Sequence, residues 1–114
     1  MISSYVGGRT VPGTAGSLTS TNPARLDDVV AEVSLASAEQ VVEAFRVATE
    51  AQRAWADTPA PVRGRVIAQV GRLVEANKQV LAELVTREVG KPMAESLGEV
   101  QEIIDTCDFF LGEG

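Results

Sequence analysis

Residues 37–67, SAEQVVEAFRVATEAQRAWADTPAPVRGRVI, decide the fold, because the sequence changes there from an extended to a helical pattern. Ser37 followed three residues later by Gln40 has the form of a capping box, in which each side chain hydrogen-bonds the backbone amide of the other residue. Apolar residues then recur at helical spacing on one face. We expect the two aromatic residues of this helix, Phe45 and Trp55, to lie in the core.

Further helices follow toward the C-terminus. The prolines within residues 58–61 end the first helix and start a second, because proline is tolerated in the first helical turn but not in the interior. We expect a break near Asn77 and a left-handed C-cap at Gly90, after which Pro92 opens the last helix. In that helix six apolar residues recur at steps of three and four and predict one buried stripe: Met93, Leu97, Val100, Ile104, Cys107 and Leu111.

The residues before the first helix predict short strands, separated by glycine and proline. The expected strands are residues 4–6, 10–11, 18–21 and 28–33. Gly7 and Gly8 suit a tight hairpin turn, because paired glycines allow positive φ angles. The sequence therefore predicts an α/β fold, with strands and loops in residues 1–36 and three to four helices in residues 37–114.

Composition excludes several functions. The 10 basic and 16 acidic residues give a net charge of −6, which repels nucleic acid and anionic membranes. No apolar run reaches the roughly 18 residues of a membrane-spanning helix, and there is no secretory signal, so we expect a cytoplasmic protein. With no histidine and one cysteine, the chain lacks the usual zinc ligands and any Ser-His-Asp or Cys-His arrangement. We therefore expect Cys107 to be a small buried residue rather than a nucleophile.

The apolar faces of the helices predict that these residues belong to a longer polypeptide. Short strands form a stable sheet only when helices cover them, and the helices here have wide apolar faces of their own. The last helix closes at Gly112-Glu113-Gly114 with no following element, which we interpret as an interruption. We expect the remainder of the same polypeptide to cover these faces.

Four stretches, taken in order, resemble the N-terminal region of the NAD(P)-dependent aldehyde dehydrogenase superfamily. They are YVGGRTV (5–11), TNPARLDDVVAEV (21–33), residues 37–67 quoted above, and REVGKPMAESLGEV (87–100). The resemblance implies a Rossmann-like cofactor domain that these residues begin, a catalytic domain and an oligomerisation arm. It also implies NAD or NADP as cofactor, an aldehyde substrate and a homodimer or homotetramer. In this family a cysteine thiolate attacks the aldehyde, but Cys107 matches no catalytic position, and no glycine-rich cofactor turn is present. The resemblance therefore implies no catalytic or cofactor-binding residue here, and an inactive isolated segment.

Two peripheral roles follow from the resemblance. Some members hold a monovalent cation at positions that match Ser20, Thr21 and Glu88, and oxygen ligands suit a hard cation. The segment from Gly98 looks most like the branch that acts on semialdehydes with a second polar group, where an acid at the position of Glu102 touches that group at the substrate entrance. The plainer interpretations are that Glu88 is a solvated acid at a helix end and that Glu102 belongs to a solvated acidic face.

Two other functions stay open from the sequence alone. The first is a free-standing helical interaction module whose apolar stripe, from Met93 to Leu111, docks on another protein. The second is an autonomous enzyme that uses carboxylates such as Glu99 and Glu102, which are three residues apart on one helix.

Overall fold

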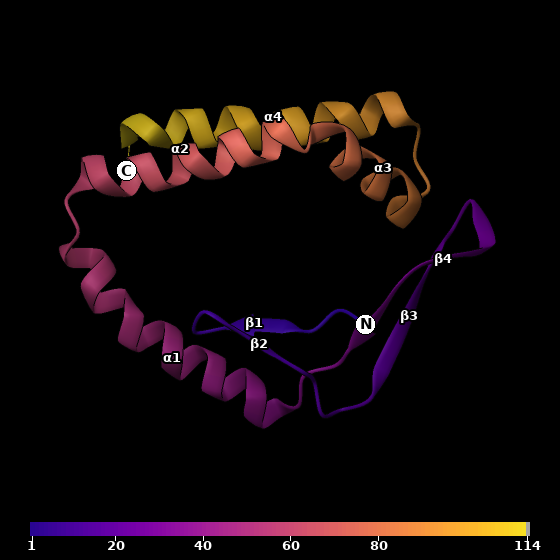
Figure 1. Cartoon of the computed structure of the whole chain (residues 1–114), viewed down its shortest axis with the longest axis horizontal. Helices are drawn as coiled ribbons and strands as arrows, with labels where there is room; N and C mark the ends of the chain where they lie inside the picture. Colours follow the sequence, from indigo (N-terminus) through magenta and orange to yellow (C-terminus); the bar gives the residue numbers. More distant parts are fainter. Residues whose placement is uncertain (114) are drawn as a thin grey trace. The chain divides into compact units, whose positions relative to one another are not determined.

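The structure, a computed structural model, describes residues 1–113, and for Glu113 it describes the backbone alone. Gly114, the last residue of the segment that we interpreted as an interruption, lies outside the described residues. Its elements in chain order are β1 (Ser4–Val6), β2 (Arg9–Val11), β3 (Ser17–Asn22), β4 (Arg25–Ser34), α1 (Ala38–Asp57), α2 (Ala60–Ala76), α3 (Lys78–Val89) and α4 (Met93–Glu113) (Figure 1). The chain divides into two compact units, Met1–Asn22 with Leu26–Asp57 and Pro23–Arg25 with Thr58–Gly114. The expected α/β class is confirmed. None of the helices in the described residues is both long and apolar enough to cross a membrane.

In the first unit, β1 and β2 form the predicted hairpin. They are antiparallel, and Ser4 lies opposite Val11. The turn is made by Gly7 and Gly8, whose φ angles are 58° and 78°. Two consecutive positive φ angles are typical of the tight turn that matches the twist of a hairpin. The paired glycines therefore predicted this turn correctly.

Strands β3 and β4 form a second two-stranded sheet, in which β4 begins three residues earlier in the sequence than expected. The sequence placed the second of these strands at residues 28–33, but β4 already begins at Arg25. Only Pro23 and Ala24 lie between the two strands. The fixed φ angle of proline suits a short turn in which the chain reverses direction. The Asn22 side-chain amide also donates to Asp28 Oδ2 at 3.2 Å.

Helix α1 begins as predicted but does not bury its aromatic residues. The amide of Gln40 donates to Ser37 Oγ at 3.3 Å, and the amide of Ser37 donates to Gln40 Oε1 at 3.0 Å, which confirms the capping box. No residue of α1 is buried. Phe45 is 72% exposed and Trp55 is 40% exposed, so the expectation that they lie in the core is wrong. The physical reason is that the short β1–β2 hairpin is too narrow to cover a helix of 20 residues.

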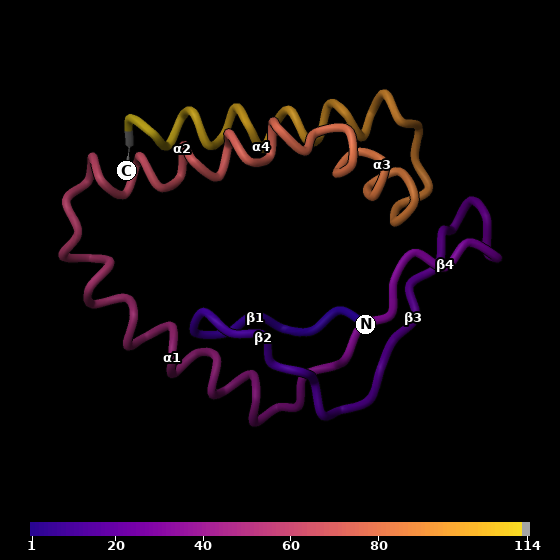
Figure 2. Tube along the Cα trace, viewed as in Figure 1, coloured from indigo at the N-terminus to yellow at the C-terminus, as the bar shows by residue number. Residues whose placement is uncertain are grey.

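The core of the second unit is the seam where α4 runs antiparallel beside α2 (Figure 2). Small residues of α2, namely Gly64, Ala68 and Gly71, are buried there. On α4, Val100, Ile104 and Cys107 are buried, which confirms the centre of the predicted stripe. Leu111 is 46% exposed, so the expected burial is wrong at that end. Its backbone, rather than its side chain, approaches Gly64.

Helix limits in the second unit follow the predicted signals. The break falls at Asn77, between α2 and α3, and the Asn77 side-chain amide donates to the carbonyl of Leu73 at 2.8 Å. Helix α3 ends at Gly90, which has a φ of 73° and donates its amide to Thr86 at 2.9 Å. A left-handed residue at this position is the common way to close a helix. The described residues therefore form four helices, within the expected three to four.

Candidate functional site

Glu102, the residue expected at the substrate entrance, lies exposed on α4 and borders two open hollows. The first has a volume of about 370 Å³ and is lined by Glu102, Asp105, Thr106 and Phe109. The second, of about 310 Å³, is lined by Glu99, Glu102, Ile103, Thr106 and Cys107. Phe109 contacts Phe110 edge to face, with ring centroids 5.3 Å apart. This face of α4 therefore combines carboxylates with an aromatic ring, a surface that favours a positively charged group.

The acidic neighbours of Glu102 already have partners. Glu99 forms an ion pair with Lys91. Asp105 accepts a hydrogen bond from the Gln101 side-chain amide at 2.8 Å, and the Gln101 oxygen accepts one from Lys78. The Glu102 side chain has neither a hydrogen bond nor an ion pair within the described residues. Of these three acids, Glu102 is the one whose carboxylate is available to a ligand.

The residues of the predicted cation site lie in different units. Ser20 and Thr21 are in β3, in the first unit, whereas Glu88 is exposed in the last turn of α3, in the second. Among the residues that the structure describes, no group of three or more Cys, Asp or Glu side chains is arranged to hold a metal ion. The cation site stays a prediction.

Cys107 is packed inside the second unit, as expected for a small buried residue. Cys107 is 8% exposed, and a Cβ atom placed on Gly71 would lie 2.8 Å from the Cβ atom of Cys107. Helix α2 therefore covers it closely. Because Val100 and Ile104 are buried in the same seam, the stripe does not offer the docking surface that a free-standing interaction module requires.

Within the described residues the chain passes directly from a strand to a helix once, between β4 and α1, and this passage does not fit a dinucleotide. A phosphate-binding turn needs glycines that bring free helix amides close to the phosphates. Here the connecting residues are Leu35, Ala36 and Ser37, and the Ser37 hydroxyl already accepts from an amide of the first turn. We assign no residue of this chain to the cofactor.

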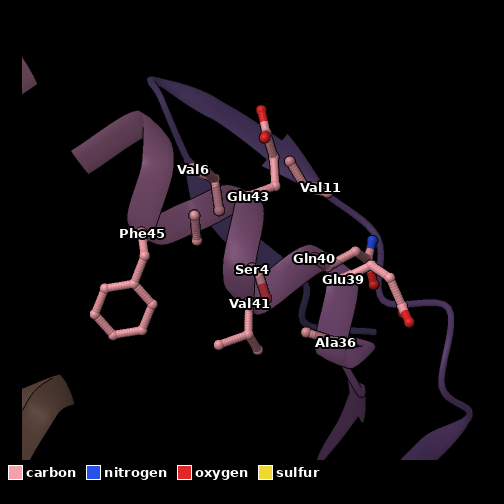
Figure 3. Close-up of a pocket in the computed structure, with 10 residues that line it drawn as sticks. Ser4, Val6, Val11, Ala36, Glu39, Gln40, Val41, Glu43 and Phe45 are labelled. Atoms are coloured by element: carbon pink, nitrogen blue, oxygen red, sulfur yellow. The ribbon is translucent and has the colours of Figure 1, made fainter. Parts of the chain in front are cut away.

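An apolar groove of about 340 Å³ lies between the β1–β2 hairpin and α1 (Figure 3). Its apolar lining residues are Val6, Val11, Ala36, Val41, Ala44 and Phe45. Two carboxylates at its edge are held in their charged form. Hydrogen bonds from the backbone and from Ser37 lower the pKa of Glu39, and the hydrogen bond from Arg46 lowers the pKa of Glu43. Neither group is suited to donate a proton near neutral pH.

The sequence did not indicate Lys78, Gln101 or Phe109 as neighbours of the α4 surface around Glu102. The spacing of Gln101 and Asp105 is the four-residue step at which helical side chains meet, so that contact could have been predicted. Lys78 and Gln101 are 23 residues apart, and no spacing rule joins them.

Comparison with known proteins gives consistent matches. The model of the family described as "Aldehyde dehydrogenase family" matches residues 11–114. The α-aminoadipic semialdehyde dehydrogenase of Bos taurus is 46% identical over 83 residues, which cover 73% of this chain and 15% of that protein. The structure of an NAD-dependent benzaldehyde dehydrogenase from Corynebacterium glutamicum aligns with a TM-score of 0.84 and 28% identity, over 91% of this chain and 23% of that chain.

A second solved structure is still more similar in fold. 3,6-Anhydro-L-galactose dehydrogenase in complex with NAP aligns with a TM-score of 0.89 and 32% identity, over 95% of this chain and 23% of that chain. The chain thus spans less than a quarter of the length of each of these three proteins.

Proposed function

The chain belongs to the aldehyde dehydrogenase family, and from that premise we propose that it is the N-terminal part of an NAD(P)-dependent semialdehyde dehydrogenase. The match of residues 11–114 carries this proposal, and the semialdehyde named in the bovine relative supports the substrate class. The whole enzyme oxidises the aldehyde to a carboxylate and reduces NAD or NADP. The names of the two similar structures, which mention NAD and NAP, support that cofactor class.

We propose that residues 1–36 and 37–114 are parts of the cofactor domain and that they are inactive alone. The thiol of Cys107 is packed against α2, which argues against a role as nucleophile. The passage from β4 to α1 lacks the glycines that a dinucleotide needs. The catalytic and cofactor-binding residues are then supplied by the remainder of the polypeptide.

The remainder of the polypeptide is also the proposed partner of the exposed apolar residues. Val41 and Phe45 at the groove of the first unit are 46% and 72% exposed. Isolated exposed apolar residues are common, but a whole helix without a buried residue is not stable by packing. A dye that fluoresces on apolar surfaces should bind the isolated chain strongly and the full-length polypeptide weakly. Equal binding would contradict this part of the proposal.

Three further features of the whole protein are proposed from the family. They are a homodimer or homotetramer, a cytoplasmic location and a monovalent cation held at Ser20, Thr21 and Glu88. The cation is testable in the full-length polypeptide, where potassium or sodium should raise the melting temperature. Glu88→Gln should remove that increase, because it takes away the charged oxygen ligand, whereas an unchanged increase would exclude Glu88 as a ligand.

We propose that Glu102 recognises a positively charged group at the far end of the semialdehyde. Three observations support this role: the exposure of Glu102, its place at both hollows, and its lack of an ion-pair partner among the described residues. Because Glu99 is paired with Lys91, a substrate ammonium meets a carboxylate without an ion-pair partner at Glu102. The same observations argue against an enzyme that works through Glu99 and Glu102 alone, since both are exposed and Glu99 is engaged in an ion pair with Lys91.

The test compares two variants of the full-length enzyme on two substrates. Glu102→Gln should lower kcat/KM for an ammonium-bearing semialdehyde by about 10- to 100-fold, the usual worth of a hydrogen bond to a charged group. The same substitution should leave kcat/KM for an uncharged aldehyde of equal length unchanged. Glu95→Gln is the matched control, because Glu95 is exposed on the same helix and borders neither hollow. Equal losses on both substrates, or from both variants, would rule out charge recognition by Glu102.

A further inference from the structure

The loop from Pro12 to Gly16, which follows β2, is fastened on one side to the end of β4. The amide of Gly13 donates to Ser34 Oγ at 2.9 Å. Ala15 and Leu35 are joined by a hydrogen bond of 2.9 Å, and the amide of Leu35 donates to Gly16 at the same distance. This side of the loop therefore has a continuous set of hydrogen bonds.

The Gln40 side chain of α1 forms hydrogen bonds with the other side of the loop. Its Oε1 atom accepts hydrogen bonds from the amide and the hydroxyl of Thr14, each at 3.0 Å. Its Nε2 atom donates to the carbonyl of Pro12 at 2.9 Å. The same Oε1 atom accepts from the amide of Ser37 in the capping box. One uncharged side chain thus joins the start of α1 to the loop through both atoms of its amide group.

The loop continues directly from β2, because β2 ends at Val11 and the loop starts at the next residue. The apolar groove lies between these two elements, and Gln40 and Val11 both line it (Figure 3). We propose that Gln40 is a latch that holds the β1–β2 hairpin against α1. When its hydrogen bonds to the loop are lost, the hairpin moves away from α1 and the apolar side chains of the groove become more exposed.

The test is hydrogen exchange on the full chain with three variants. Gln40→Ala removes all contacts between the side chain and the loop, whereas Gln40→Glu keeps the acceptor and loses the donor to Pro12. Gln79→Ala is the matched control, because within the described part of the chain the Gln79 side-chain amide makes only an intrahelical contact of 3.4 Å with Glu83. In Gln40→Ala the amides of Thr14, Val6 and Val11 should exchange about tenfold faster or more, because Val6 and Val11 belong to the hydrogen-bonded pairs of the hairpin. Gln40→Glu should lie between Gln40→Ala and the unchanged chain, and Gln79→Ala should not differ from the unchanged chain.

Dye binding gives a second readout on the same variants. Binding of a dye that fluoresces on apolar surfaces should rise in the order Gln79→Ala, Gln40→Glu, Gln40→Ala. Unchanged exchange at Val6 and Val11 in Gln40→Ala would overturn the latch. If Gln40→Ala unfolds the whole chain, Gln40→Glu decides: faster exchange of the hairpin amides with intact helices supports the latch, and unchanged exchange overturns it.

Discussion

Replacing Gly71 with alanine should push α2 and α4 apart. A Cβ atom on Gly71 would lie 2.8 Å from the Cβ atom of Cys107. Carbon atoms in contact normally lie about 3.5–4.0 Å apart, so the two helices must separate by roughly 1 Å or distort. The obstacle is a Cβ atom, which no rotation of the Cys107 side chain can move. The strain therefore falls on the backbones of the two helices.

The magnitude follows from two opposing effects. Alanine stabilises a helix interior by about 1 kcal/mol relative to glycine. Overpacking a close-packed seam costs about 1–3 kcal/mol. Gly98→Ala measures the first effect without the second, because Gly98 lies in α4 with no neighbouring atom within 4 Å of the added Cβ atom. Gly98→Ala should therefore gain up to about 1 kcal/mol, and Gly71→Ala should be less stable than Gly98→Ala by about 1–3 kcal/mol.

The assay is urea unfolding of the full chain, followed by circular dichroism. Comparison of midpoints at equal slope gives the difference in unfolding free energy. Gly64→Ala should be the most damaging of the three variants, because its Cβ atom would lie 2.4 Å from the carbonyl oxygen of Leu111, which is backbone. Cys107→Gly should restore part of the loss in Gly71→Ala, whereas Cys107→Ala should not, since it keeps the Cβ atom. If Gly71→Ala were as stable as Gly98→Ala, the close seam between α2 and α4 would be refuted.

Three further predictions concern single residues. Gly90→Ala should destabilise the chain by about 1–3 kcal/mol in the same urea assay, because Gly90 has a φ of 73° and an added Cβ atom would lie 2.7 Å from Pro23; a neutral effect would argue against this C-cap. Cys107→Ser should lower the melting temperature of the full-length enzyme and leave kcat unchanged, since it buries a hydroxyl in an apolar seam; a folded variant without turnover would overturn the structural role of Cys107. The Arg46 guanidinium holds the pKa of Glu43 below its ordinary 4.5, so the contribution of this pair is present above that value and lost as the pH falls through the lowered pKa; in an NMR titration Arg46→Gln should move the pKa of Glu43 upward, and an unchanged pKa would exclude the contact.

The limits of the helices could be predicted from the sequence because they depend on a few neighbouring residues. The spacing of Ser37 and Gln40 predicted the start of α1, and Gly90 predicted the end of α3. Each signal is a hydrogen bond or a backbone conformation within one turn of chain. The stripe on α4 was also predicted correctly at its centre, because a period of 3.6 residues defines one face.

Burial could not be predicted in the same way, since it depends on which element covers a face. Phe45 and Trp55 have the pattern of core residues, yet they are 72% and 40% exposed. Periodicity shows that a face is apolar and does not show what lies against it. Likewise, the importance of Glu102 was inferred from resemblance. Only the structure shows that its neighbours Glu99 and Asp105 have partners whereas Glu102 has none among the described residues.

The central claim is that these residues are an incomplete part of a semialdehyde dehydrogenase. The most direct test measures reduced cofactor formed from NAD or NADP and a semialdehyde, with the isolated chain and with the full-length polypeptide that contains it. We predict turnover by the full-length polypeptide and none by the isolated chain. Turnover by the isolated chain, or a well-folded full-length polypeptide that reduces neither cofactor with any aldehyde, would contradict the claim.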